Sequence, residues 1–230
     1  MARDVTWERL DRISPRDAVV TGDTSEDDTD PSATPTPPTE AERGLDPILS
    51  RPLIVFVHDD PDLCDGKCAG ACQRYFEVED QVLGREKILL ALGAFRPIRM
   101  TAENAKAEPL LAETGPAAVP RLVFLDVVRG RAVSLHGSKL SASRVYAEMK
   151  KMVSGFYRER LDGLVKKHQK ILGLHDKLAQ EEFRIREQIS MTGDDRRARK
   201  LEGQLDEIVE EQRELDRKVE RLWTLKMKPL

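Results

Sequence analysis

The chain has 230 residues, of which 40% are hydrophobic and 5% aromatic, so it can bury one modest core but not the body of a large enzyme. Charged side chains make up 34% of the residues, which is typical of long solvated helices, and the net charge of -3 argues against a dedicated nucleic-acid binder. Without a membrane-length apolar run or the apolar stretch of a signal peptide, the sequence predicts a cytoplasmic protein that binds neither membrane nor nucleic acid.

Residues 1–50 form an acidic leader with twelve acidic and five basic side chains. Its segment 21–42 has four prolines, seven acids and no base, and cannot bury enough apolar surface to offset the entropy of ordering. We therefore expect a largely disordered leader. Near its start, four apolar side chains follow helical spacing: Val5, Trp7, Leu10 and Ile13. They predict either a marginal helix or a peptide that docks on the globular domain or on a partner.

A different pattern covers residues 51–153. The run 52–57 is apolar and rich in β-branched residues, as in a strand covered on both faces. The later elements are expected in this order: a helix at 73–92, a strand at 95–102, a short helix at 107–115, strands at 120–127 and 131–137, and a helix from about Ser141. This order predicts an α/β domain with a parallel crossover and a tight hairpin at Arg129-Gly130.

Heptads replace the strand pattern over residues 154–228. The first series has Leu161, Leu164, Ile171, Leu178, Ile185 and Ile189, and the second has Ala198, Leu201, Leu205, Ile208, Leu215, Val219 and Leu222. Gly193 is expected to end the first arm (154–191), and Asp194 to cap the second (195–226). The sequence therefore predicts a C-terminal antiparallel coiled-coil hairpin.

Antiparallel pairing about Gly193 places Leu178 near Ile208 and His175 opposite Gln212. A polar layer of this kind usually sets the register of a coiled coil. Several apolar residues lie off the seam: Val165, Leu172, Leu174, Phe183 and Val209. They predict further burial against a second copy or a partner helix, so we expect a homo-oligomer that forms through the hairpin.

All three cysteines lie in the stretch CDGKCAGACQRYF, residues 64–76, at a spacing of four. An odd number of thiols within nine residues makes a poor disulfide framework. A redox or metal motif in a reducing compartment fits the pattern better.

The order of elements and several motifs in residues 52–153 resemble the thioredoxin-like superfamily. The resemblance is most specific in AETGPAAVPRLVFLDVVRGRAVSLHGSKL, where Val119-Pro120 precedes a hydrophobic strand, a glycine hairpin and a second strand that ends in glycine. In that family the corresponding peptide bond before proline is cis. The resemblance implies that the backbone of Val119 lies beside the cysteine loop and, with Pro120, binds an extended client protein.

The same resemblance implies that the cysteines carry thiol chemistry. Cys68 would attack a client disulfide, and Cys72 or Cys64 would resolve the mixed disulfide. Cys72 is expected just before the following helix. The chain departs from the family in having CxxxCxxxC in place of CxxC, and in lacking the family's tryptophan before the motif and its buried aspartate.

Three interpretations of the cysteines stay open at this stage. They are a thiol-redox site, a zinc site with His58 as fourth ligand, or small buried residues in a redox-silent adaptor. The zinc spacing matches none of the usual fingers or ribbons, so no cofactor or metal is expected. The leading prediction is a thiol-redox or redox-derived protein-interaction module. The alternative is a non-enzymatic adaptor or scaffold protein with the same fold.

Overall fold

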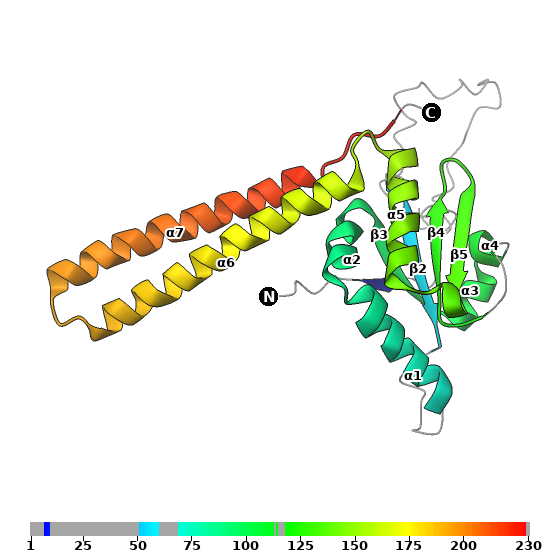
Figure 1. Cartoon of the computed structure of the whole chain (residues 1–230), viewed down its shortest axis with the longest axis horizontal. Coiled ribbons are helices and arrows are strands. Elements are labelled where there is room, and N and C mark those ends of the chain that lie inside the picture. The colour runs from blue at the N-terminus through cyan, green and yellow to red at the C-terminus, as the bar shows by residue number, and fades with distance from the viewer. Residues whose placement is uncertain (1–6, 10–50, 60–68, 113, 115–117, 229–230) are drawn as a thin grey trace, which may run out of the picture. The chain divides into compact units, whose positions relative to one another are not determined.

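The computed structural model describes residues 7–9, 51–59, 69–112, 114 and 118–228 (Figure 1). Contacts divide this part of the chain into two compact units. The sheet unit consists of the described residues of Thr6–Val78 and Arg96–Leu140. The hairpin unit consists of the described residues of Glu79–Phe95 and Ser141–Leu230.

Among the described residues, the sheet unit contains one mixed sheet of five strands in the order β1-β3-β2-β4-β5. The strands are β1 (Glu8–Arg9), β2 (Leu53–His58), β3 (Arg96–Thr101), β4 (Arg121–Asp126) and β5 (Arg131–His136). β2 and β3 are parallel, and β4 is antiparallel to both β2 and β5. The α/β class, the four expected strands and the parallel crossover are therefore confirmed.

The two central strands have the most apolar sequences, LIVFVH and RLVFLD, and all their residues are buried. One face of the sheet carries a core of Val, Leu, Ile and Met side chains from β2, β3 and β4, which pack with Ala105 and Leu111. These two residues come from α3 (Ala102–Ala107) and α4 (Pro109–Ala112), so the two short helices cover this face (Figure 1).

Helix α1 (Ala69–Val78) supplies Tyr75 to the opposite face, where its ring stacks on Phe56 of β2. The single helix expected at 73–92 is wrong, because α1 continues as a π-helical turn (Glu79–Leu83) that ends at Gly84. The amide of Gly84 donates to the carbonyl of Glu79, and a Cβ at Gly84 would lie 2.8 Å from the Asp80 carbonyl oxygen. A new helix, α2 (Glu86–Ala91), therefore follows the turn.

The hairpin unit also contains α5 (Ala142–Phe156), α6 (Leu161–Met191) and α7 (Asp195–Leu222). α6 and α7 pack along each other as an antiparallel pair (Figure 1). Asp194 caps α7, since its carboxylate accepts from the amides of Arg196 and Arg197 at 2.9 and 3.4 Å. The expected turn is therefore confirmed. None of the described helices is both long and apolar enough to cross a membrane.

The seam between α6 and α7 is apolar with polar side chains at its margins. Ile185, Leu201 and Ile208 are buried together, and Leu178 packs against them as the heptads predict. The predicted pairing of His175 with Gln212 is wrong. Gln212 donates instead to Glu182 at 2.9 Å, and Nε2 of His175 lies 3.3 Å from Asp216 Oδ1. A carboxylate is the stronger acceptor for the Gln212 amide, which explains the difference.

The base of the hairpin is held by Trp223, which follows α7. Its indole Nε1 donates to Nδ1 of buried His168 on α6 at 3.2 Å, so this histidine carries its proton on Nε2. The indole also lies on Gly93, where a Cβ would meet Cδ2 of Trp223 at 2.6 Å. Gly93 follows α2. The side chain of Trp223 therefore connects the end of α7 with the start of α6 and with the segment after α2.

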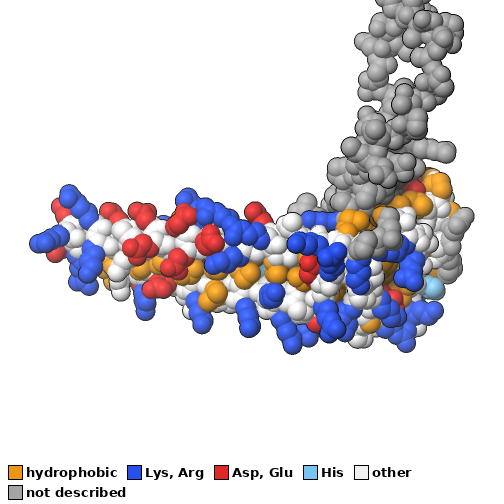
Figure 2. All heavy atoms as spheres, turned by 90° about the horizontal axis from the view of Figure 1, so that it is seen from above, with side chains coloured by type: hydrophobic (Ala, Val, Ile, Leu, Met, Phe, Trp, Pro, Cys, Tyr) orange, Lys and Arg blue, Asp and Glu red, His pale blue; other side chains and the backbone are white. Residues whose placement is uncertain are grey.

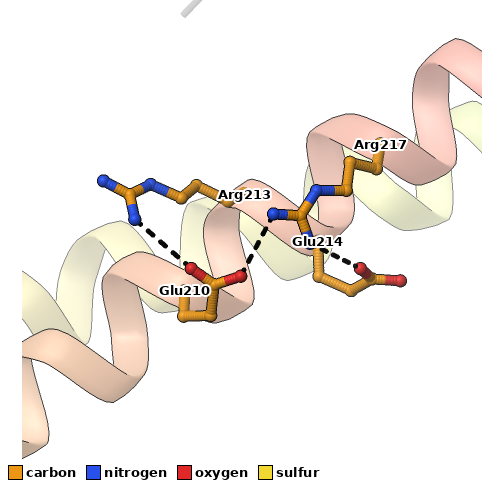
Figure 3. A network of polar contacts seen from close by, with 4 residues as sticks. All are labelled: Glu210, Arg213, Glu214 and Arg217. Carbon is orange, nitrogen blue, oxygen red and sulfur yellow. Dashed lines mark hydrogen bonds and ion pairs between the residues drawn. The ribbon is translucent and has the colours of Figure 1, made fainter.

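The outer surface of the hairpin is charged. Figure 2 shows acidic and basic side chains interspersed along it, with apolar side chains visible between the two helices. On α7, Glu210 pairs with Arg213 and Arg217 at 3.3 and 3.2 Å, and Glu214 pairs with Arg217 at 3.3 Å (Figure 3). Exposed pairs of this kind contribute about 0–1 kcal/mol each, so the hairpin depends mainly on its seam and its base.

Of the predicted leader 1–50, residues 7–9 lie in the described part, and Glu8–Arg9 form strand β1 where a helix was one expectation. The division at residues 51–153 and 154–228 stays a prediction. The contacts group residues 79–95 and 141–153 with the hairpin.

Replacement of Gly93 by alanine tests the base of the hairpin. We expect Gly93→Ala to destabilise the protein by about 1–3 kcal/mol, because the new methyl group would overlap the indole of Trp223. Urea unfolding followed by tryptophan fluorescence and circular dichroism measures the change. Gly173→Ala in α6 is the matched control, since its Cβ would meet no atom within 4 Å. It should stabilise the helix by about 0.5–1 kcal/mol, and an equal loss in both variants would contradict the packing described.

The pH dependence of stability tests the polar contact across the seam. Hydrogen bonds from Gln212 and Arg186 hold the pKa of Glu182 below its usual range, against an opposing effect of partial burial. A carboxylate with a lowered pKa stabilises the fold above its unfolded pKa of about 4.3, and the gain is lost as the pH falls through the folded value. We therefore expect Glu182→Gln to lose about 1 kcal/mol at pH 7 and progressively less as the pH falls below the unfolded pKa of about 4.3.

The control for this experiment is Glu181→Gln, whose carboxylate lies 3.7 Å from Arg184 on the exposed side of the same helix. Chemical unfolding at neutral and acid pH, followed by circular dichroism, measures both variants. A loss for Glu182→Gln that is the same at both pH values would rule out the charged contact.

Candidate functional site

The candidate site lies at the end of the sheet where β2 and β3 finish. His58 is the last residue of β2 and pairs in register with Thr101, the last residue of β3. Because these strands are parallel, both carboxyl ends open on the same edge, which is where α/β proteins usually bind ligands. The hydroxyl of Thr101 is used to cap α3, since it accepts from the amide of Asn104 at 3.3 Å.

Val119 and Pro120 reach the same end of the sheet from β4. Arg121, the first residue of β4, is paired with Val57, so the chain before it continues at the level of His58. The peptide bond between Val119 and Pro120 is cis, as the resemblance implied. Pro120 is buried, while half-buried Val119 packs against the core beneath the sheet.

Of the three cysteines, only Cys72 lies in the described part of the chain. Cys64 and Cys68 lie outside them, so their predicted contact with Val119 stays a prediction. Cys72 lies in the first turn of α1, which begins at Ala69. The expectation that Cys72 precedes the helix is therefore wrong. Cys68 is instead the residue that directly precedes the helix in the sequence.

His58 is oriented by contacts on two sides. Its Nδ1 lies 2.6 Å from the carbonyl oxygen of Asp59, which can only accept, so the proton is on Nδ1. The imidazole packs between aromatic rings, with centroids 5.5 Å from Phe56 and 5.0 Å from Tyr75. In the neutral ring, Nε2 is therefore the nitrogen that can accept a hydrogen bond or bind a metal.

Tyr75, one turn after Cys72, connects α1 with the sheet. Its ring stacks on Phe56 at 5.5 Å, and its hydroxyl accepts a hydrogen bond from Nη1 of Arg99 on β3 at 3.1 Å. Phe56 and Arg99 are register partners on neighbouring strands, so they lie side by side on this face. Phe56, His58 and Arg99 of the sheet therefore all contact this one side chain of α1.

Arg99 and Phe56 also hold the side chain of Trp7. The guanidinium carbon of Arg99 lies 5.3 Å from the centroid of the indole, and the ring of Phe56 lies 6.2 Å from it. A cation over an indole is attracted by the negative face of the ring. Trp7, Tyr75 and His58 therefore belong to one continuous cluster around Phe56.

The other cation at this end of the sheet is Arg121, which is 4% exposed. Burial lowers the pKa of its guanidinium, although the group stays charged at neutral pH. In the alternation of β4, Arg121 shares a face with Val123 and Leu125, which pack with α3 and α4. It therefore lies on the face of the sheet opposite to His58 and Tyr75.

The described residues contain no cluster of three His, Cys, Asp or Glu side chains that could hold a metal ion. His58 is thus the one member of the zinc hypothesis with a described side chain. Because none of the three thiols of that set has a described side chain, the hypothesis is untested, and so is the expectation that no metal binds.

Sequence reasoning missed Tyr75 and Arg99. A signal for Arg99 was present, since a charged residue between Ile98 and Met100 in a strand must point to the opposite face. Tyr75 is one helical turn from Cys72, which places it near the cysteine motif but does not indicate its partners. The contact with Trp7 has no local signal, because more than ninety positions separate Trp7 from Arg99.

No family model, curated protein or solved structure matches the chain. Its function is therefore argued from the residues and the topology alone.

Proposed function

We propose that this protein is a thioredoxin-like thiol-redox or redox-derived protein-interaction module, with a helical hairpin for oligomerisation or docking. The observation that carries the proposal is the strand order β3-β2-β4-β5, with β2 and β3 parallel and the last two strands antiparallel. This topology, with a helix between β2 and β3 and another after β5, agrees with the order of elements in the thioredoxin-like superfamily.

The place of the cysteines in the sequence supports thiol chemistry. Cys68 directly precedes α1, and the first turn of α1 contains no acidic residue. Exposed amides and the positive end of the helix dipole favour a thiolate at such a position, and a nearby carboxylate would oppose it. Cys68 is therefore the better candidate for the nucleophile, and Cys72 lies one turn further along.

The proposed reaction is a two-electron reduction of a client disulfide. The Cys68 thiolate attacks one client sulfur, forms a mixed disulfide and releases the first client thiolate. The thiolate of Cys72 or Cys64 then attacks the Cys68 sulfur, which releases the second client thiolate and leaves a disulfide in this protein. A dithiol reductant returns the protein to its starting state. Val119 and Pro120 would hold the extended client chain.

The hairpin has the surface features of an association element. Three apolar side chains of α6 stay exposed: Leu174 (48%), Phe183 (70%) and Met191 (76%). Isolated exposed apolar residues are common, but these three lie on one helix whose seam already faces α7. Leu174 and Phe183 lie nine positions apart and so on opposite sides of α6. A second copy or a partner helix along the side with Phe183 and Met191 would remove these two from water.

Thiol substitutions test the redox proposal. We expect Cys68→Ser to abolish reduction of insulin disulfides by a dithiol, because the attacking sulfur is lost. Cys72→Ser should keep the first attack and accumulate a mixed disulfide that gel electrophoresis without reductant detects, unless Cys64 resolves it. Cys64→Ser separates the two resolving thiols, because it should stay at least about half as active as the unchanged protein if Cys72 resolves the mixed disulfide.

Two outcomes contradict the redox proposal. Activity that is unchanged in Cys68→Ser rejects the assigned nucleophile. No activity in the unchanged protein, together with three thiols that resist alkylation in the folded state, favours the adaptor function. Elemental analysis of the purified protein separates the zinc alternative, which requires about one metal ion per chain.

Light scattering at tens of micromolar tests self-association. We expect a mass above that of one chain, and we expect Phe183→Glu to reduce it, because a charge on the exposed apolar surface of α6 opposes burial. Gln188→Glu adds the same charge at another exposed position of the helix and should leave the mass unchanged. A single-chain mass for the unchanged protein would contradict the oligomerisation proposal.

A further inference from the structure

Strand β1 extends the sheet from a distant part of the chain. Glu8 and Arg9 pair in parallel with Ile98 and Arg99 on the outer edge of β3. The preceding residue, Trp7, is half-buried and packs against the ring of Phe56 and the guanidinium of Arg99. An extended segment that adds to a sheet edge and places an aromatic side chain in a neighbouring site is a known mode of peptide recognition.

Strand β1 is too short for its backbone hydrogen bonds alone to keep it attached to β3. It has two residue pairs with β3, whereas strands usually have about five or six residues. Residues 10–52 separate it from β2 along the chain, so its attachment also carries the entropic cost of closing a long loop. The side chain of Trp7 must therefore supply much of the attachment.

The site that Trp7 occupies is shared with helix α1. Phe56 contacts the rings of both Trp7 and Tyr75. Arg99 lies over the indole of Trp7 and donates to the hydroxyl of Tyr75. Groups that share partners in this way are energetically coupled. Removal of the Trp7 side chain therefore changes how strongly Tyr75 is held.

We propose that the outer edge of β3, with Phe56 and Arg99, is a binding site for an extended tryptophan-bearing segment, which this chain fills reversibly with its own residues 7–9. Occupation of this site holds the Arg99 guanidinium in place toward Tyr75 and so stiffens α1. Departure of the segment exposes the edge of β3 and loosens the helix that carries Cys72.

Residues 7–9 therefore act as a regulatory segment. Its docking sets the mobility of α1, and its release opens the sheet edge. This inference does not depend on thiol chemistry, because binding and helix mobility are measured without it.

A labelled peptide tests the binding site in the full-length protein. The peptide has the sequence of residues 1–16 with a fluorescein label, and its anisotropy is measured with two hosts, the unchanged chain and Trp7→Ala. We expect Trp7→Ala to bind the peptide at least about tenfold more tightly, because its own leader no longer fills the site. A peptide in which tryptophan is replaced by alanine should bind neither host.

Arginine substitutions in the Trp7→Ala host locate the site. Arg99→Leu should abolish peptide binding, and Arg99→Lys, which keeps the charge and a long side chain, should weaken it. The matched control is Arg131→Leu, an exposed arginine at the start of β5, at the other edge of the sheet, which should leave binding unchanged. Equal peptide affinity of the two hosts, or an equal effect of Arg131→Leu, would overturn the proposal.

Hydrogen exchange tests the coupling to α1. We expect amides of α1 to exchange about tenfold faster in Trp7→Ala than in the unchanged chain, and the unlabelled peptide to restore slow exchange. Tyr75→Phe removes the hydroxyl that accepts from Arg99, so in this background Trp7→Ala should have a smaller effect on α1. Exchange in α1 that does not respond to Trp7→Ala would overturn the coupling even if the peptide binds.

Discussion

Strand β2 is the element on which the sheet unit depends. It lies between a parallel neighbour and an antiparallel one, and its six residues are buried on both faces of the sheet. Alternate side chains therefore serve different layers. Val55 and Val57 belong to the core beneath α3 and α4, whereas Phe56 and His58 face α1. The candidate site follows from this position, because β2 ends where its parallel partner β3 ends and where the chain enters β4.

On the face that carries α1, two side chains of the sheet contact both the helix and strand β1. Phe56 and Arg99 are neighbours in register, and each contacts both Tyr75 and Trp7. An arginine suits this position because its planar guanidinium can lie over one ring and donate a hydrogen bond to another group. The helix with Cys72 and the leader strand are thereby held by the same atoms. This arrangement links a distant segment to the helix that contains Cys72.

The hairpin unit rests on a different principle. Its seam is formed by the heptad positions of two helices that follow each other directly in the chain. At the base of the hairpin, contacts join residues that are far apart in the sequence: Trp223 donates to His168 and lies on Gly93. Polar contacts at the seam, such as the one between Glu182 and Gln212, fix how α6 and α7 are aligned along each other. They are not what makes each segment helical.

The sequence by itself determined the four main strands, the crossover, the helical hairpin and the cap at Asp194, because each has a local pattern of apolar residues, glycine or capping side chains. It also indicated the cis bond before Pro120 through resemblance. Tertiary structure alone decided the π-turn after α1, the start of α1 before Cys72, the partner of Gln212 and the cluster of Trp7, Phe56, Tyr75 and Arg99. Periodicity reports which face of an element is apolar, but a contact between single polar or aromatic side chains far apart in the chain is selected by geometry that exists only after folding.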